Sequence, residues 1–127
     1  MTRLLLIGVG GFLGSVARYL LSGTVQTLLR SETFPFGTLA VNVLGCFVVG
    51  LVSYLADSRG AFTGDTRAFI VVGVLGGFTT FSAFGNETIN LARDAEPWLA
   101  LSNVLAHGVI ALGAVWAGRA TAFAIWR

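Results

Sequence analysis

Four long apolar runs separated by short polar segments restrict the fold of this chain more than any other feature. The runs cover about residues 4–21, 36–56, 68–92 and 98–120. A helix needs about 20 mostly apolar residues to cross the hydrocarbon core of a bilayer. The pattern therefore predicts an all-α membrane protein with a single domain, residues 1–127, made of four transmembrane helices.

Composition excludes an ordinary soluble domain. Hydrophobic residues make up 55% of the chain and charged residues 11%, whereas soluble domains carry about 25% charged residues. The connections expected at 22–35, 57–67 and 93–97 are short and polar. A secretory signal is the alternative for the first run, because Arg3 precedes an apolar stretch, but no small-residue cleavage pattern follows it.

The same composition argues against several functional classes. Eight arginines without a lysine are spread singly over the loops, which does not match a nucleic-acid-binding patch. One cysteine, Cys46, and one histidine, His107, provide neither a disulfide framework nor a metal-ligand cluster. No nucleophile accompanied by a base and an orienting group is evident, so an enzyme is not expected.

The arginines also bear on topology, because cytoplasmic loops are enriched in positive charge. Four spans place both termini on one side of the membrane. That side would carry Arg3, Arg59, Arg67, Arg119 and Arg127, and the other side Arg18, Arg30 and Arg93. So small a bias permits either a fixed orientation or insertion both ways with pairing to an inverted copy. Since four helices enclose too little volume for a water-filled path, transport would require an oligomer.

Small residues in the runs favour close helix contacts, which replace the hydrophobic effect as the main source of association in lipid. Gly10 and Gly14 form a GxxxG pair in the first run. Further glycines are Gly45, Gly50, Gly73, Gly76, Gly77, Gly108 and Gly113. General helix packing is the alternative explanation for all of them.

Polar groups inside apolar runs mark bundle interiors or permeation routes by default. Arg18 either faces such a route or extends its long side chain to the interface. Asn42 offers two hydrogen-bond donors and one acceptor, with a buried interhelical hydrogen bond as the alternative role. Glu87 is the only acid well within a run and is a candidate partner for an arginine or a hydroxyl network. Asn103 and His107 lie one turn apart, in a pattern typical of a hydrogen-bonded core histidine.

The centre of the third run, from Gly76 to Phe84, predicts a broken helix. Tandem glycines and the β-branched Thr79 and Thr80 weaken a continuous helix there. A break frees backbone carbonyls, which membranes tolerate only where protein, water or an ion satisfies them. The break therefore indicates an ion site, and an unbroken helix with close-packed glycines is the alternative.

Helical spacing around this point predicts two stripes of side chains. Phe78, Phe81 and Phe84 form an aromatic stripe. Ser82, Asn86 and Asn90 form a polar stripe. An aromatic stripe alone is typical of core packing, and the polar stripe beside it favours an ion path.

The chain resembles the Fluc family of fluoride channels, also called the CrcB family, over all four expected helices. The resemblance rests on GGxTTFSxF at Gly76 to Phe84, on GTLxxN at Gly37 to Asn42, and on the glycine-rich first helix that ends in Arg18. It implies a homodimer of two antiparallel, dual-topology subunits with pores lined by both subunits. Such a dimer would pass fluoride passively and selectively across a bacterial inner membrane and confer fluoride resistance.

The resemblance also implies site residues. Phe81, Phe84 and Asn42 would line the path, Ser82 would begin a hydroxyl track and Glu87 would end it. The complete fluoride pathway would contain Arg18, Asn42, Thr80, Phe81, Ser82, Phe84 and Glu87. Backbone carbonyls at Gly76 and Thr79 of each subunit would hold a structural sodium ion at the twofold axis.

The chain departs from the family pattern at Ala83, where threonine or serine is common, and at Gly85 and Asn86, which replace a hydroxyl-containing pair. These changes would reroute the polar track or indicate a heterodimer with a related subunit. A small multidrug-type, proton-coupled cation antiporter is the main alternative function, but it requires an acid in the first helix, which has none. A non-conducting membrane assembly protein is the third possibility.

Overall fold

The protein is described by a computed structural model that covers residues 1–126, apart from the side chain of Arg59. Within these residues the regular structure is entirely helical, and four spans are long and apolar enough to cross a membrane: Thr2–Leu29, Phe36–Ser58, Gly64–Arg93 and Pro97–Trp126. The prediction of an all-α protein with four spans is confirmed, and the chain is a multi-pass membrane protein. Arg127 and the Arg59 side chain, which entered the arginine count, lie outside the described part.

Two spans are continuous helices and two are composite. The first is α1 (Thr2–Leu29) and the second is α2 (Phe36–Arg59). The third consists of α3 (Gly64–Arg67), the π-helical η1 (Ala68–Leu75), α4 (Gly76–Phe78) and α5 (Phe81–Arg93). The fourth consists of α6 (Pro97–Leu105), the π-helical η2 (Ala106–Ala111) and α7 (Leu112–Trp126).

The helices extend beyond the apolar runs, and the prediction that a connection begins at Ser22 is wrong. α1 continues to Leu29 because its polar residues are accommodated within the helix. The hydroxyls of Thr24 and Thr27 donate to the carbonyls of Leu20 and Gly23, one turn earlier. A threonine hydroxyl that donates to the carbonyl of the preceding turn is satisfied within the helix, so the helix can continue past that residue.

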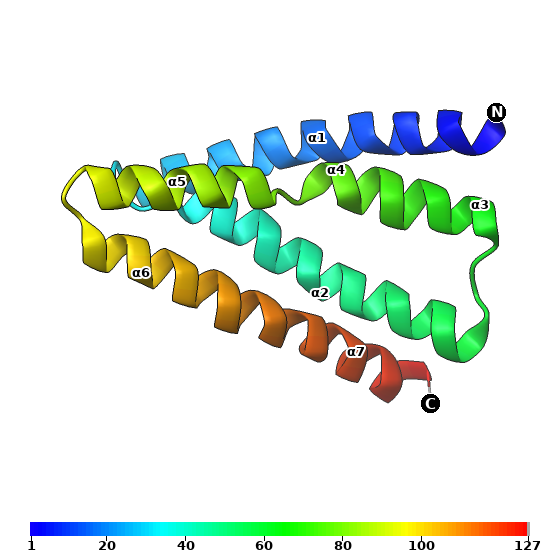
Figure 1. Ribbon diagram of the computed structural model, residues 1–127. Coiled ribbons are helices and arrows are strands. Elements are labelled where there is room, and N and C mark those ends of the chain that lie inside the picture. The colour runs from blue at the N-terminus through cyan, green and yellow to red at the C-terminus, as the bar shows by residue number, and fades with distance from the viewer. Residues whose placement is uncertain (127) are drawn as a thin grey trace.

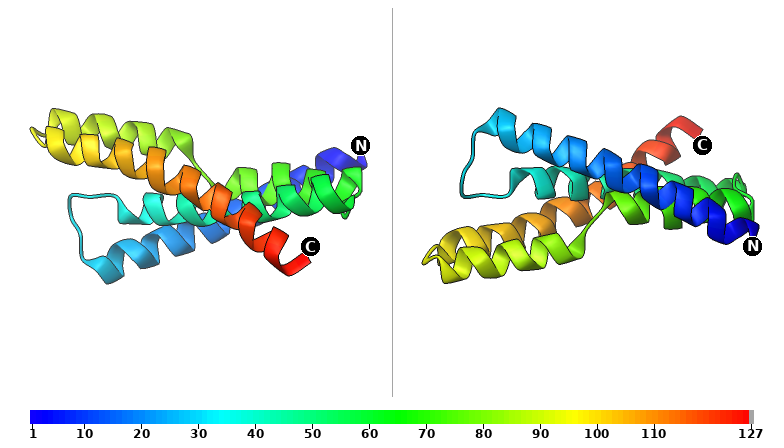
Figure 2. Two further views of the ribbon diagram at one scale, coloured as in Figure 1. Left: turned by 90° about the horizontal axis from the view of Figure 1, so that it is seen from below. Right: turned by 90° about the horizontal axis from the view of Figure 1, so that it is seen from above.

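The helices pack as side-by-side pairs (Figure 1). α1 lies along η1 and α4, α2 lies along α7, and α5 lies along α6. The third span therefore packs against different helices before and after its middle: α4 contacts α1, whereas α5 contacts α6. The further views show the helices crossing near the middle of the molecule, with both termini toward one end (Figure 2).

Glycines permit backbone contact within these pairs. A Cβ added at Gly10 or Gly14 of α1 would collide with carbonyl oxygens of η1. A Cβ at Gly50 of α2 or at Gly118 of α7 would collide with the backbone of the opposite helix. The predicted close packing at the GxxxG pair is confirmed, and it forms within one chain.

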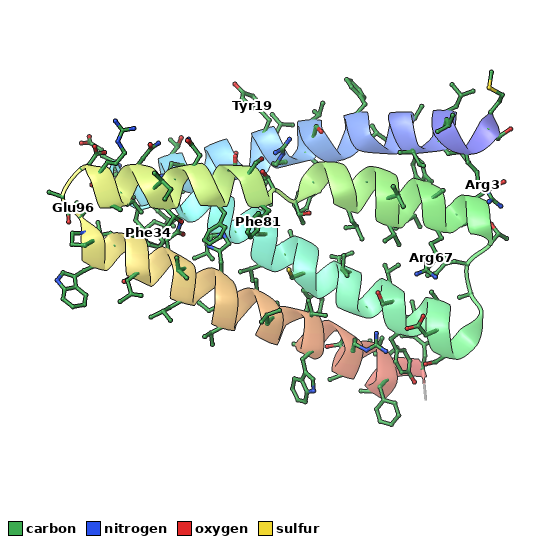
Figure 3. The ribbon with its side chains drawn as sticks, viewed as in Figure 1. Arg3, Tyr19, Phe34, Arg67, Phe81 and Glu96 are labelled. Atoms are coloured by element: carbon green, nitrogen blue, oxygen red, sulfur yellow. The ribbon has the colours of Figure 1, made fainter. Side chains whose placement is uncertain are left out.

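Two ion pairs lie between the spans toward the end that holds the termini. Arg3 Nε is 2.7 Å from Asp65 Oδ1 and links α1 to α3, and Arg119 Nη1 is 3.6 Å from Asp57 Oδ2 and links α7 to α2. All four side chains are largely exposed, so each pair contributes only about 0–1 kcal/mol. Figure 3 places Arg3 and Arg67 at this end and Glu96 at the opposite end.

Candidate functional site

The third span is interrupted at Thr79 and Thr80. Both residues have extended backbones, with φ −88° and ψ 159° at Thr79 and φ −151° and ψ 113° at Thr80. α4 ends at Phe78 and α5 begins at Phe81. The predicted break is confirmed, and the alternative of a continuous helix is excluded.

Asn42 on α2 braces this break. Its Nδ2 donates to the Thr80 carbonyl at 3.0 Å, and its Oδ1 accepts from the Thr80 amide N–H at 2.8 Å. The side-chain amide thus replaces the helical partners that Thr80 has lost. Because the Thr80 N–H points to Asn42, the carbonyl of Gly76 loses its usual i+4 donor. Asn42 is only 8% exposed, and the second hydrogen on its Nδ2 remains for another acceptor.

The break sets two helix ends of opposite polarity next to each other. At the start of α5 the Thr80 hydroxyl accepts from the Ala83 N–H at 3.1 Å, and it lies 3.2 Å from Ser82 Oγ. The amides of Phe81 and Ser82 belong to the partially positive end of this helix, which favours anions. The last carbonyls of α4 belong to a partially negative end, which favours cations.

A cavity of about 500 Å³ lies beside the break. It is lined from α2, from the break, from α5 and from the η2 region by Asn42, Gly45, Cys46, Val49, Thr79, Thr80, Phe81, Phe84, Val104, His107, Gly108, Ala111 and Leu112. The Phe81 and Phe84 rings are 5.4 Å apart at their centroids, and the Phe84 ring is 4.3 Å from that of His107. Phe81, near the centre of the molecule in Figure 3, is 83% exposed.

Phe78 does not belong to this aromatic group, so the prediction of a single three-phenylalanine stripe is wrong. The extended residues Thr79 and Thr80 interrupt the helical register between Phe78 and Phe81. The ring of Phe78 instead packs over Gly45 of α2. The polar residues Ser82, Asn86 and Asn90 are all exposed on α5, as expected for one stripe.

A second, polar cavity of about 300 Å³ adjoins the break on the side of α1. Its walls include Arg18, Thr38, Thr80, Ala83 and Glu87. Thr38 Oγ1 donates to Glu87 Oε1 at 2.6 Å, while Glu87 Oε2 is buried and has no hydrogen-bond partner among the described residues. Arg18 is half-buried in this wall and forms no ion pair with Glu87.

Glu87 also borders the polar spaces near the α1–α2 connection. One of them is lined by Ser22, Gln26, Glu32 and Thr38 among others, and another reaches Asn90 and Asp94. Glu87 therefore lies where three polar cavities meet.

Comparison of the sequence with known proteins identifies its family. The family model described as "CrcB-like protein, Camphor Resistance (CrcB)" matches residues 5–119. The chain belongs to the CrcB family. It is 48% identical over 124 residues to "Fluoride-specific ion channel FluC" of Opitutus terrae, covering 96% of this chain and 93% of that protein.

Other CrcB relatives are similar over nearly their whole length. "Fluoride-specific ion channel FluC" of Geobacter sulfurreducens is 47% identical over 118 residues, covering 93% of this chain and 94% of that protein. "Fluoride-specific ion channel FluC 1" of Methanosarcina acetivorans is 42% identical over 122 residues, covering 96% and 92%. These relatives are named as ion channels, which agrees with the expectation of a non-enzymatic protein.

In this CrcB protein the residues predicted from sequence gather around the break. Asn42, Phe81 and Phe84 line the first cavity, Arg18 and Glu87 line the second, and Thr80 lines both. Ser82 is exposed and lines neither cavity. Gly76 begins the short α4, whose usual i+4 donor at Thr80 is taken by Asn42, and Thr79 lies in the break.

Sequence reasoning missed the partners of these residues. Thr38 was not singled out as the donor to Glu87, although it lies within the GTLxxN motif. Asn103 is fully buried and donates from Nδ2 to Thr88 Oγ1 at 2.9 Å. Thr38 and Glu87 are 49 positions apart, and no periodicity in the sequence signals such a contact.

Proposed function

We propose that this CrcB protein is a passive, fluoride-selective channel of a bacterial inner membrane that exports fluoride through two pores at the interface of an antiparallel dimer. The names of its relatives support fluoride as the ion. The observation that carries the proposal is the break in the third span, which brings Phe81, Phe84 and Asn42 to one cavity.

The chemistry of this cavity suits a small, hard anion. Such an anion holds water strongly, so a pore must replace that water with directional donors. The remaining hydrogen of Asn42 Nδ2 and the amides at the start of α5 are donors of this kind. The Phe81 and Phe84 rings carry positive edges that attract an anion without holding it as a full positive charge would.

A second, inverted copy would complete the site. Phe81 is an aromatic residue of the cavity wall and yet is 83% exposed in the single chain. Gly108 on the same wall and Gly113 on α7 have no described atom near the position of an added Cβ. We therefore assign these surfaces to a homodimer contact, with a related subunit as the alternative partner.

The proposal includes a structural sodium ion at the centre of the dimer. The Gly76 and Thr79 region fits such an ion because its carbonyls lie at the partially negative end of α4, and unwound carbonyls of broken helices suit sodium. Gly76 is exposed, with only the Val71 carbonyl near an added Cβ. When bound, sodium would supply positive charge that holds the two breaks together.

Anion release from liposomes tests the proposal directly. Liposomes that contain the purified protein and are loaded with fluoride should release it far faster than protein-free liposomes. Parallel liposomes loaded with chloride should retain their anion. Equal release of the two halides would refute selectivity, and fluoride release at the protein-free rate would refute conduction.

A further inference from the structure

His107 lies in the wall of the cavity that is also lined by Asn42, Phe81 and Phe84. It is part of η2, a π-helical segment within the fourth span. Such segments inside α-helices are frequent at functional sites. Its ring lies against Phe84, with centroids 4.3 Å apart and planes inclined by 38°. The expectation of a hydrogen-bonded core histidine accounts for only one of its two ring nitrogens.

The hydrogen bonds of His107 determine which nitrogen carries the proton. Nδ1 is 3.0 Å from the Asn103 carbonyl oxygen, and a carbonyl can only accept, so Nδ1 is the donor. Asn103 is itself fixed by its hydrogen bond to Thr88, whose hydroxyl donates to the Phe84 carbonyl at 2.7 Å. The ring is therefore held by the same helix that carries the pathway phenylalanines.

With Nδ1 protonated, the neutral ring presents Nε2 as a bare acceptor. Nε2 is buried and has no hydrogen-bond partner among the described residues. His107 lines the cavity, so a lone pair on its ring would repel an anion held there. A second proton converts Nε2 into a donor and adds a positive charge, and both changes attract an anion.

Two other titratable groups face His107 from the helices around it. Glu87 of α5 is close enough to interact with it electrostatically. Cys46 of α2 lines the same cavity, and it is the only other titratable residue of that wall. Neither of them forms a hydrogen bond with His107 Nε2.

We propose that His107 Nε2 is a proton-dependent anion contact of the pathway, which makes anion flux faster in acid than at alkaline pH. The inference rests on the proposed function for the identity of the anion. Since an anion would bind the protonated form more tightly, binding of the anion and of the proton must favour each other.

The first test measures fluoride release from liposomes between about pH 8 and about pH 5.5, the range in which histidine changes charge. The rate from protein-free liposomes is subtracted at each pH to remove diffusion of neutral hydrogen fluoride. We expect several-fold faster release in acid from the native protein and no pH dependence from His107→Gln, which keeps a polar side chain but does not titrate. Cys46→Ser should keep the acid-to-alkaline rate ratio of the native protein, because Cys46 lines the same wall without bonding to Nε2. A native rate independent of pH, or a His107→Gln variant with the native ratio, would overturn the inference.

The second test uses the fact that the chain has one histidine. In protein labelled with ¹⁵N-histidine, NMR spectra should show the Nδ1–H tautomer at alkaline pH. The midpoint of the histidine titration should lie at higher pH in fluoride than in chloride. An identical midpoint in both salts would contradict the proposed contact. Release no faster than from protein-free liposomes would refute the proposed function instead, and the titration would still decide the role of His107.

Discussion

Asn42 shows how one side chain can replace a stretch of helical hydrogen bonding. It meets both backbone polar groups of Thr80 across 38 positions of sequence. An unpaired buried N–H or carbonyl is strongly unfavourable in lipid, where water does not compensate. The break therefore depends on a residue from another helix, so the geometry of the cavity and the stability of the fold are coupled at this position.

Replacing Asn42 with alanine should destabilise the protein by about 1–3 kcal/mol for each Thr80 group left unpaired. Thermal unfolding in detergent, followed by circular dichroism, measures this loss. Asn42→Asp retains the acceptor for the Thr80 N–H and should lie between the native protein and Asn42→Ala. Asn90→Ala is the matched control, because Asn90 is exposed on α5. Equal melting temperatures for Asn42→Ala and Asn90→Ala would contradict the bracing role.

Replacing Phe81 or Phe84 with isoleucine should slow fluoride release while the dimer stays intact. Isoleucine keeps much of the apolar volume but lacks the ring edge that would face the anion. Phe81→Ile should leave folding unaffected in particular, since the side chain is 83% exposed in the single chain. Release rates from liposomes and size-exclusion chromatography provide the two readings. Unchanged release from both variants would show that these two residues serve only in packing.

At the scale of helices, the glycines divide sharply by environment. Gly8 and Gly14 both lie in α1, yet Gly14 contacts the backbone of the third span whereas nothing described lies near an added Cβ at Gly8. Backbone atoms cannot move aside to make room for an added methyl group as the end of a flexible side chain can. Contacts of this kind fix α1 against η1 and thereby position the break.

Gly14→Ala should therefore destabilise the fold, because overpacking typically costs about 1–3 kcal/mol. Gly8→Ala should be neutral or stabilising, since alanine is favoured over glycine in a helix by about 1 kcal/mol. Melting temperatures of the two purified variants give the comparison. A Gly14→Ala variant as stable as Gly8→Ala would show that α1 can shift away from η1.

The four spans and the break in the third were largely predictable, because both depend on residues that are close in sequence. The length of an apolar run sets a span, and the residues from Gly76 to Thr80 weaken the helix where it breaks. The helix ends were harder to predict. Thr24 and Thr27 were expected in a connection, but they lie within α1 and donate their hydroxyl hydrogen bonds to its backbone carbonyls. The role of Phe78 was mistaken because periodicity was carried across two extended residues. In the site, Arg18, Asn42 and Glu87 were recognised as polar residues within apolar runs. The contacts of Asn42 with Thr80 and of Thr38 with Glu87 join distant positions and required the fold.

For the whole molecule, the proposed dimer should depend on sodium. Replacing sodium with a large organic cation should weaken the dimer, because the carbonyls around the two breaks would then repel one another. Size-exclusion chromatography in matched salts measures the dimer fraction. Thr79→Ala should respond as the native protein does, since the carbonyl belongs to the backbone. A dimer fraction unaffected by the cation would argue against the sodium site.

The exchange of neighbours within the third span links the site to the lipid around it. α4 packs against α1 and α5 packs against α6, and only two extended residues separate α4 from α5. A thinner or thicker bilayer changes the tilt of helices that span it, and a difference in tilt between these two units would fall on Thr79 and Thr80. We therefore expect acyl-chain length to alter the geometry of the break that Asn42 holds.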